Sequence, residues 1–260
     1  MMSKVMEQWL EVAPQWILDS PEWFGDFVYK LYKCFIFDDR YMLFVRGLGN
    51  TLLLTFFALI IGVILGVVVA LIRVTWDKNH TDMYGISKFS LRIANTISNI
   101  YLTVIRGTPV VVQILIIYFV ILAGSRNKVL AGCLAFGINS GAYVAEIIRS
   151  GIMSVDEGQM EAGRSIGFGY VQTMKYIILP QAFKNVLPAL GNEFIVLLKE
   201  TAVVGYIGLE DLTFVANTIG GNAYEYLYPL GAVAIIYLIL VVGISSLVNR
   251  LERRLRNSDR

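Results

Sequence analysis

Residues 47–72 read GLGNTLLLTFFALIIGVILGVVVALI. This run of 26 residues contains no charged side chain. About 20 apolar residues in a helix are enough to cross a hydrocarbon core of roughly 30 Å. The apolar residues are continuous and do not alternate with polar ones, so the run predicts a helix and not a strand of a closed barrel. We interpret it as a first membrane span.

Four further stretches are apolar enough to cross a membrane: residues 107–125, 129–148, 186–207 and 227–248. The composition agrees, because 56% of the chain is hydrophobic and only 16% is charged, against about 25% in soluble domains. We predict an all-α, polytopic transmembrane helix bundle of about five spans. The membrane domain covers residues 45–250, with a separate segment at 1–44 and a basic tail at 251–260.

The positions of lysine and arginine predict the orientation of the spans, because cytoplasmic loops are enriched in these residues. With the C-terminus in the cytoplasm, thirteen fall inside: Arg73, Lys78, Lys88, Arg92, Arg149, Arg164, Lys175, Lys184, Arg250, Arg253, Arg254, Arg256 and Arg260. The outer loops hold only Arg126 and Lys128, and the N-terminal segment holds five such residues accompanied by seven acidic ones. Five spans then place the N-terminus outside.

The segment before the first span has an amphipathic pattern. After Ser20-Pro21, a helix start, one face carries Phe24, Phe27, Val28, Leu31 and Phe35. This pattern fits a helix lying at the outer membrane interface or, equally well, a helix packed on the bundle. The N-terminal sequence has no continuous apolar core, so we expect no cleavable signal peptide. Residues 75–95 are polar and predict a cytoplasmic hairpin or short helix.

Several function classes find no support in the sequence. The net charge of +2 gives no indication of nucleic-acid binding. Cys34 and Cys133 fit no metal or redox spacing, and His80 is the only histidine. The chain has no G-x-x-x-x-G-K-[ST] motif for ATP and no metalloprotease or nucleophile-elbow motif. We therefore expect neither an enzyme nor a resident metal or cofactor.

Residues 150–180, SGIMSVDEGQMEAGRSIGFGYVQTMKYIILP, form the most informative cytoplasmic loop. Ser154 and Glu157 have the spacing of a capping box that starts a helix. Gly167 suits a left-handed helix end. A second helix is predicted from Tyr170 to Leu179, stopped by Pro180. The pattern predicts a helix-turn-helix elbow whose first helix presents small residues, namely Gly158, Ala162 and Gly163, to another surface.

This loop resembles the EAA loop of integral membrane permeases of ABC importers. Glu161-Ala162-Gly163, Gly167, Ile177 and Leu179-Pro180 match its spacing, and Gly163 replaces the usual alanine. In the family the loop inserts into a cleft on the ATP-binding subunit. The resemblance therefore implies docking of that subunit by Gly158, Glu161, Ala162, Gly163, Gly167, Ile177, Leu179 and Pro180.

The resemblance extends over roughly residues 46–256 and points to the polar amino acid branch, the histidine, glutamine, arginine and opine type. It is carried by Gly49-Asn50-Thr51-Leu52, Arg106-Gly107-Thr108-Pro109, Gly141-Ala142-Tyr143-Val144-Ala145-Glu146-Ile147-Ile148-Arg149, Ile178-Leu179-Pro180-Gln181-Ala182 and Arg250-Leu251-Glu252-Arg253-Arg254. It implies the MetI-like ABC permease fold in the bacterial cytoplasmic membrane. The implied partners are a second permease copy or related sister subunit, two ATP-binding subunits that hold ATP and Mg²⁺, and an extracytoplasmic solute-binding protein.

Charged and polar residues inside a span suggest a function, because burying them in lipid is costly. The stretch 186–207 carries Asn192 and Lys199 on one helix face and Glu193 and Glu200 on another. Lys199 suits a substrate carboxylate, either glutamate suits an ammonium group, and Thr201 adds a hydroxyl. Equally, these charges could only neutralise one another and hold the bundle together.

Two further charged positions have a simpler interpretation. Glu146 and Arg149 lie three residues apart, so an ion pair at the end of a span explains them, although Glu146 is also a candidate for the substrate pathway. Arg106 precedes Thr108-Pro109 and is explained by anchoring at the inner membrane edge.

The resemblance favours a permease subunit that moves a polar L-amino acid by alternating access. A permease for another small polar solute is the nearest alternative. A self-sufficient secondary transporter would usually show an internal inverted repeat, and the sequence shows none. The sequence leaves open which amino acid is carried and whether the permeases pair as identical copies.

Overall fold

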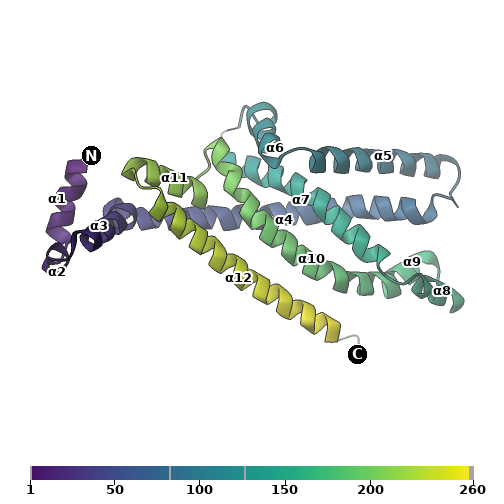
Figure 1. Cartoon of the computed structure of the whole chain (residues 1–260). Coiled ribbons are helices and arrows are strands. Elements are labelled where there is room, and N and C mark those ends of the chain that lie inside the picture. The colour runs from purple at the N-terminus through teal and green to yellow at the C-terminus, as the bar shows by residue number, and fades with distance from the viewer. Residues whose placement is uncertain (1, 82, 126, 258–260) are drawn as a thin grey trace. The chain divides into compact units, whose positions relative to one another are not determined.

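The computed structural model describes residues 2–81, 83–125 and 127–257. Every regular element in these ranges is a helix (Figure 1), so the predicted all-α class is correct. Arg126 and Arg260, and the side chain of Arg256, lie outside what is described. Contacts divide the chain into two compact units. One comprises Met1–Leu53 with Ala202–Leu240, and the other comprises Leu54–Thr201 with Val241–Arg260.

The elements follow one another in a simple order. The N-terminal ones are α1 (Met2–Val12), α2 (Gln15–Leu18), α3 (Glu22–Leu31), η1 (Tyr32–Ile36), η2 (Phe37–Asp39) and α4 (Arg40–Asn79). Next come α5 (Gly85–Gly107), α6 (Val110–Ile116), η3 (Ile117–Ile121), α7 (Lys128–Met153), α8 (Glu157–Ser165), α9 (Tyr170–Thr173) and η4 (Met174–Ile178). The last are α10 (Leu179–Glu200), η5 (Thr201–Ile207), α11 (Leu212–Ala223) and α12 (Leu227–Asn257).

Among the described residues, three helical stretches are long and apolar enough to cross a membrane: Glu22–Asn79, Lys128–Met153 and Leu227–Leu255. They contain the predicted first, third and fifth spans. The pair Gly85–Gly107 and Val110–Ile121 passes the same test together, as a broken span or a re-entrant loop. The predicted fourth span corresponds to α10 and the turn after it. α10 has 22 residues, but it carries four charged residues and is not among the helices apolar enough to cross a membrane. The count of five spans therefore stays a prediction.

The predicted second span, residues 107–125, is wrong as a continuous helix. α5 ends at Gly107, and the chain bends by 109° before Val110. Thr108 is extended, with φ −121° and ψ 144°. The cause is Pro109, which has no backbone N–H and disfavours a helical conformation in the residue before it.

The predicted connector at residues 75–95 is also too long. α4 continues to Asn79, and α5 begins at Gly85, whose φ of +65° suits glycine. Arg73 Nη1 donates a hydrogen bond of 3.0 Å to Asn95 Oδ1, which joins the two helices. The polar residues of this stretch therefore belong to faces of packed helices, and only a short turn separates them.

Glycines allow α4 and α7 to approach closely in the unit that contains Leu54–Thr201. A Cβ atom added at Gly66 would lie 2.6 Å from Val144 Cγ1, and one at Gly137 would lie 2.6 Å from Ile61 Cγ2. Small residues at helix contacts are typical of membrane proteins, where van der Waals packing drives association. α10 packs on α7 through Gly151 and Val186 in the same way. α7 is consequently the central helix of this unit.

In the other unit, hydrogen bonds join α4 to the start of α11. Asn50 Nδ2 donates to the Glu210 carbonyl at 2.8 Å. Asp211 is fully buried and caps α11, accepting hydrogen bonds from the N–H groups of Thr213 and Phe214. Burial raises the pKa of the Asp211 carboxyl, and these donors oppose the rise. These contacts give Gly49-Asn50-Thr51-Leu52 a structural role.

The N-terminal segment packs in this same unit. The Phe27 and Tyr228 rings lie 6.0 Å apart, and Lys30 Nζ lies 3.7 Å from Glu225 Oε1. Cys34 and Phe44 belong to a buried cluster with α11 residues. The segment therefore contacts other helices of this unit, and its position at the outer membrane interface stays a prediction.

Two glycines of α4 give a matched test of the α4–α7 contact. Replacement Gly66→Ala should destabilise the protein by about 1–3 kcal/mol, because the added methyl overlaps Val144. Replacement Gly49→Ala should be neutral or stabilising by up to about 1 kcal/mol, since nothing lies within 4 Å of its Cβ position. The thermal unfolding midpoint in detergent measures both. Equal midpoints for the two variants would contradict close packing at Gly66.

Candidate functional site

The predicted elbow at residues 154–180 is present, with a different cap. α8 is capped by Asp156, whose Oδ1 accepts a hydrogen bond of 2.7 Å from the Gly158 N–H. The capping box assigned to Ser154 is wrong, because Ser154 Oγ donates to the Gly151 carbonyl of the preceding helix. Gly167 has φ +90°, so the left-handed turn predicted at this residue is confirmed.

The predicted docking residues divide into an outward and an inward set. The outward set is exposed and consists of Gly158, Glu161, Ala162, Gly167, Leu179 and Pro180. Gly163 is buried, and a Cβ there would lie 2.5 Å from Thr173 Cγ2. Ile177 packs on the core of the elbow. The expectation that Gly163 faces another surface is therefore wrong, since its small size serves the packing of α8 on α9 and η4.

Pro180 does not stop the second helix of the elbow. α9 and the π-helical turn η4 run directly into α10, and Pro180 lies in the first turn of α10. A proline is tolerated there because the first N–H groups of a helix have no partner within the helix. Gln181 Nε2 donates to Gln159 Oε1 at 3.2 Å, and Asn185 Nδ2 donates to Ser154 Oγ at 3.0 Å. These contacts fasten α8 to α10.

A groove of about 410 Å³ lies between the elbow and the end of α4. Its lining comprises Asp77, Lys78, Asn79, Met153, Glu157, Met160, Glu161, Arg164 and Tyr170. The sequence did not predict that the end of α4 lines this groove, because nothing in residues 77–79 distinguishes them from an ordinary polar loop.

The structure separates the charged residues predicted in the fourth span. Glu193 is buried, and Ser140 Oγ of α7 donates a hydrogen bond of 2.7 Å to its carboxylate. Thr201 is also buried, and its hydroxyl donates to the Leu198 carbonyl within the chain. Asn192 and Lys199 are exposed, and Glu200 is half-buried. Within this chain, Glu193 and Thr201 are thus buried with hydrogen-bond partners, and a role of either residue in the substrate pathway stays a prediction.

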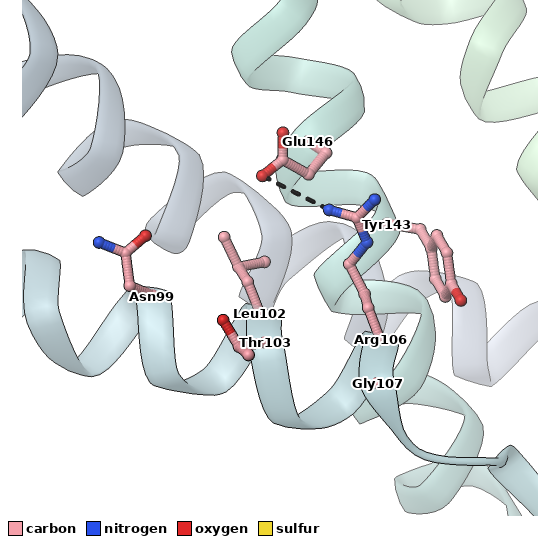
Figure 2. Close-up of a pocket in the computed structure, with 7 residues that line it drawn as sticks. All are labelled: Asn99, Leu102, Thr103, Arg106, Gly107, Tyr143 and Glu146. Atoms are coloured by element: carbon pink, nitrogen blue, oxygen red, sulfur yellow. Dashed lines mark ion pairs between the residues drawn. The ribbon is translucent and has the colours of Figure 1, made fainter.

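A pocket open to the surface lies where the end of α5 meets α7 (Figure 2). Its volume is about 450 Å³, and its lining comprises Asn99, Leu102, Thr103, Arg106, Gly107, Tyr143 and Glu146. Figure 2 shows the Arg106 guanidinium pointing toward the Glu146 carboxylate. The two groups are 3.7 Å apart, and the guanidinium also lies 5.7 Å from the centre of the Tyr143 ring.

Glu146 lies between two arginines. Arg149 Nη2 is 3.2 Å from Glu146 Oε2, so the predicted pair is confirmed. Arg149 Nη1 also lies 3.5 Å from Asp77 Oδ2 on α4. Arg106 is therefore more than a membrane-edge anchor, since it joins a chain of charges from α5 through α7 to α4. Spacing could reveal only the Glu146–Arg149 pair, because the other two pairs join residues far apart in sequence.

Gln113 fixes the bend that carries Arg106. Its Nε2 donates to the carbonyls of Ile105 and Thr108, at 2.8 and 3.0 Å, and its Oε1 accepts from Asn139 Nδ2 of α7 at 3.0 Å. A broken helix leaves carbonyls without partners, and in a membrane such groups must be satisfied by protein. The interruption at Pro109 is thereby stabilised and held against α7.

The long apolar helices, the polar pocket and the exposed elbow are the parts expected of a transport permease. The profile of the family described as "Binding-protein-dependent transport system inner membrane component" matches residues 85–257. The chain belongs to this family: it is a membrane permease subunit of the ABC importer type.

Individual relatives agree with this assignment. The chain is 38% identical over 218 residues to the arginine transport system permease protein ArtQ of Bacillus subtilis, covering 83% of this chain and 93% of that protein. It is 38% identical over 222 residues to the putative glutamine transport system permease protein GlnP of Rickettsia bellii, covering 84% and 95%.

Solved structures show the same fold. A crystal structure described as an amino acid ABC transporter with histidines has a TM-score of 0.72 and 44% identity, covering 82% of this chain and 94% of that one. An inward-facing MetNI methionine ABC transporter has a TM-score of 0.70 at 22% identity, covering 84% and 98%. The second likeness supports the predicted MetI-like fold alone.

The contact between Glu193 and Ser140 yields a test. Replacement Glu193→Gln should leave the unfolding midpoint near that of the wild type, because the amide oxygen still accepts from the Ser140 hydroxyl. Replacement Glu193→Ala should cost about 1–3 kcal/mol, since a buried hydroxyl loses its partner. Thermal unfolding in detergent measures the difference. Equal losses in both variants would show that the charge, and not the hydrogen bond, matters at this position.

Proposed function

We propose that this chain forms the membrane pathway of an ATP-driven importer for a polar L-amino acid. The observation that carries the substrate class is the pocket of Figure 2. An amino acid is a zwitterion, so its carboxylate needs a cation and its ammonium group needs an anion. Arg106 and Glu146 supply the two charges beside one opening of about 450 Å³.

The exposure of this ion pair suits a transient ligand. The Arg106 side chain is 46% exposed and the Glu146 side chain 28%, at a separation of 3.7 Å. Such a partly solvated pair gains little from its own attraction. A substrate can therefore separate the two charges, pairing its carboxylate with Arg106 and its ammonium group with Glu146, at small cost. Thr103 and Asn99 add polar groups at the edge of the pocket.

The relatives support this substrate class, since those reported above are described as permeases for arginine and glutamine and as an amino acid transporter. The remaining residues predicted for the pathway, Asn192, Lys199 and Glu200, lie on α10, away from the lining of this pocket. We assign them to the wider pathway, in which a second copy of the chain or a sister permease forms the other wall.

The energy for transport comes from a separate ATP-binding subunit dimer, which holds ATP and Mg²⁺. We infer that it docks on the outward residues of the elbow, above all Glu161 and Ala162 on α8. An extracytoplasmic solute-binding protein delivers the amino acid to the opposite face. This arrangement requires the elbow and the C-terminus to be cytoplasmic and the N-terminus to be outside, as the distribution of lysine and arginine predicts.

The elbow is continuous with the pocket through α7. Glu146 lies two helical turns before the end of α7 at Met153, and α8 begins at Glu157. The contact of Gly151 with Val186 fixes this end of α7 to α10. A displacement of α8 by closing ATPases would therefore be passed to α7 and to one wall of the pocket, which gives alternating access a physical route.

The pocket is tested by uptake of radiolabelled amino acid into vesicles that contain the assembled transporter. Replacements Arg106→Gln and Glu146→Gln should each lower uptake by about tenfold or more, because a charge-assisted hydrogen bond is worth about 1.5–3 kcal/mol. The control Arg250→Gln removes an exposed charge at the far end of α12 and should leave uptake unchanged. Unimpaired uptake in both pocket variants, with normal assembly, would exclude this pocket as the substrate site.

The elbow is tested with a pair of glycines. Replacement Gly167→Val should abolish or strongly reduce ATP-driven uptake, because a β-branched residue is strained at φ +90° and the turn must rearrange. Replacement Gly169→Ala should be tolerated, since Gly169 has φ −71°. The double variant Gly167→Val/Glu161→Lys also reverses the charge at the proposed docking residue, so its ATP-driven uptake should be at least as low. Full uptake by this double variant would contradict the docking role, whatever the substrate.

A further inference from the structure

A second polar pocket lies at the turn between α4 and α5, away from the site described above. It has a volume of about 420 Å³ and is lined by Trp76, His80, Gly85, Lys88, Phe89 and Arg92. None of the residues that line it belongs to the first pocket or to the elbow. Its lining combines two cations with three aromatic rings, which is an unusual mixture for an ordinary solvated turn.

One wall of this pocket is a pair of stacked rings. The Trp76 and His80 rings lie 5.0 Å apart at an angle of 17°. His80 Nδ1 lies 2.8 Å from the Trp76 carbonyl oxygen. A carbonyl can only accept, so this contact places the N–H at Nδ1, and Nε2 of the neutral ring is then an acceptor. The rings are thereby held in place before any ligand arrives.

The cations come from the opposite helix. Lys88 and Arg92 are one turn apart on α5, and within the described parts of the chain no carboxylate lies within 4 Å of either side chain. Asp82, in the intervening turn, lies outside the described residues. Two adjacent cations without an acidic partner favour an anionic ligand.

An apolar stripe begins at the same place. Exposed large residues recur every three or four positions along one face of α5: Ile86, Phe89, Ile93, Ile97, Ile100 and Val104. Phe89 belongs both to this stripe and to the pocket. The ligand that fits both surfaces is therefore an amphiphile, with an anionic head at Lys88 and Arg92 and an apolar tail along the stripe.

The depth of the pocket agrees with this chemistry. The uncharged run of α4 ends at Ile72, and Trp76 follows one turn later. Tryptophan is enriched at the membrane–water interface, where its ring lies at the level of the headgroups. Basic pockets between helices at the cytoplasmic surface bind anionic headgroups. The pocket thus lies where a lipid phosphate would be.

We propose that the α4–α5 turn binds one anionic phospholipid, whose phosphate is held by Lys88 and Arg92 beside the stacked Trp76 and His80 rings and whose acyl chain lies along the α5 stripe. This inference uses the membrane location of the chain and rests on the cytoplasmic position of the α4–α5 turn in the proposed function, but it does not depend on the substrate or on the docking of an ATPase. A second permease covering the same stripe is the competing occupant.

Affinity is tested by native mass spectrometry on the assembled full-length protein in mild detergent. It is titrated with phosphatidylglycerol or with phosphatidylcholine carrying the same acyl chains. The first binding event should favour phosphatidylglycerol by about thirtyfold, given an attraction of about 1 kcal/mol for each of the two cations. The double variant Lys88→Gln/Arg92→Gln should lose this preference, and Lys88→Arg/Arg92→Lys should keep it.

The matched control is Arg250→Gln/Arg253→Gln, which removes two exposed cations from α12 and should keep the full preference. If this control loses the preference equally, or if the Lys88/Arg92 pair can be removed without effect, the proposed site is overturned.

A second measurement locates the acyl chain. Phosphatidylglycerol with a diazirine in its acyl chain should label the stripe near Ile93 and Ile97 on irradiation. Labelling there that phosphatidylcholine does not compete away supports the proposal. Absence of label from α5 in the assembled transporter would overturn it and would indicate that another protein surface covers the stripe.

Discussion

The close approach of α4 and α7 is the contact on which the functional half of the molecule depends. Water provides no driving force between helices inside a bilayer, so packing must come from backbones that nearly touch. Gly62, Gly66 and Gly137 provide this contact by leaving no Cβ in the way. α7 is thereby fixed, and its polar residues are presented at defined positions.

α7 supplies a partner to most polar side chains that matter here. Asn139 accommodates Gln113 at the bend, Ser140 satisfies Glu193, and Glu146 receives Arg106 and Arg149. Tyr101 of α5 also donates to the Ile138 carbonyl at 2.6 Å. Each of these groups would be costly in lipid without its partner. α7 therefore gives these polar side chains their partners inside a bundle that is otherwise apolar.

The chain changes direction at two places, the break at Thr108-Pro109 and the elbow at residues 154–180, and particular side chains stabilise each one. At the break, Gln113 replaces the backbone partners that Pro109 removes, and Arg106 emerges at the pocket edge. At the elbow, Gly163 permits α8 to lie against η4, and Gly167 permits the sharp reversal. Packing inside the elbow leaves Glu161 and Ala162 exposed, which is consistent with the docking role proposed for them.

The sequence by itself determined the helical class, the first, third and fifth long apolar helices, the elbow with its turn at Gly167 and the ion pair of Glu146 with Arg149. Each of these depends on residues close together in the chain, through apolar run length, glycine conformation or a spacing of three. A local signal for the bend also exists, because Pro109 follows Gly107-Thr108. The apolar residues on both sides of Pro109 nevertheless led to the prediction of one continuous span.

Only the tertiary structure decided which charges meet. Arg106 and Glu146 are forty residues apart, and Glu193 finds Ser140 on a different helix. The same holds for the inward position of Gly163 and for the pocket at the α4–α5 turn. A residue's side chain contacts whatever the packing of helices brings to it, and helix packing is set by many small van der Waals contacts that no local pattern of residues records.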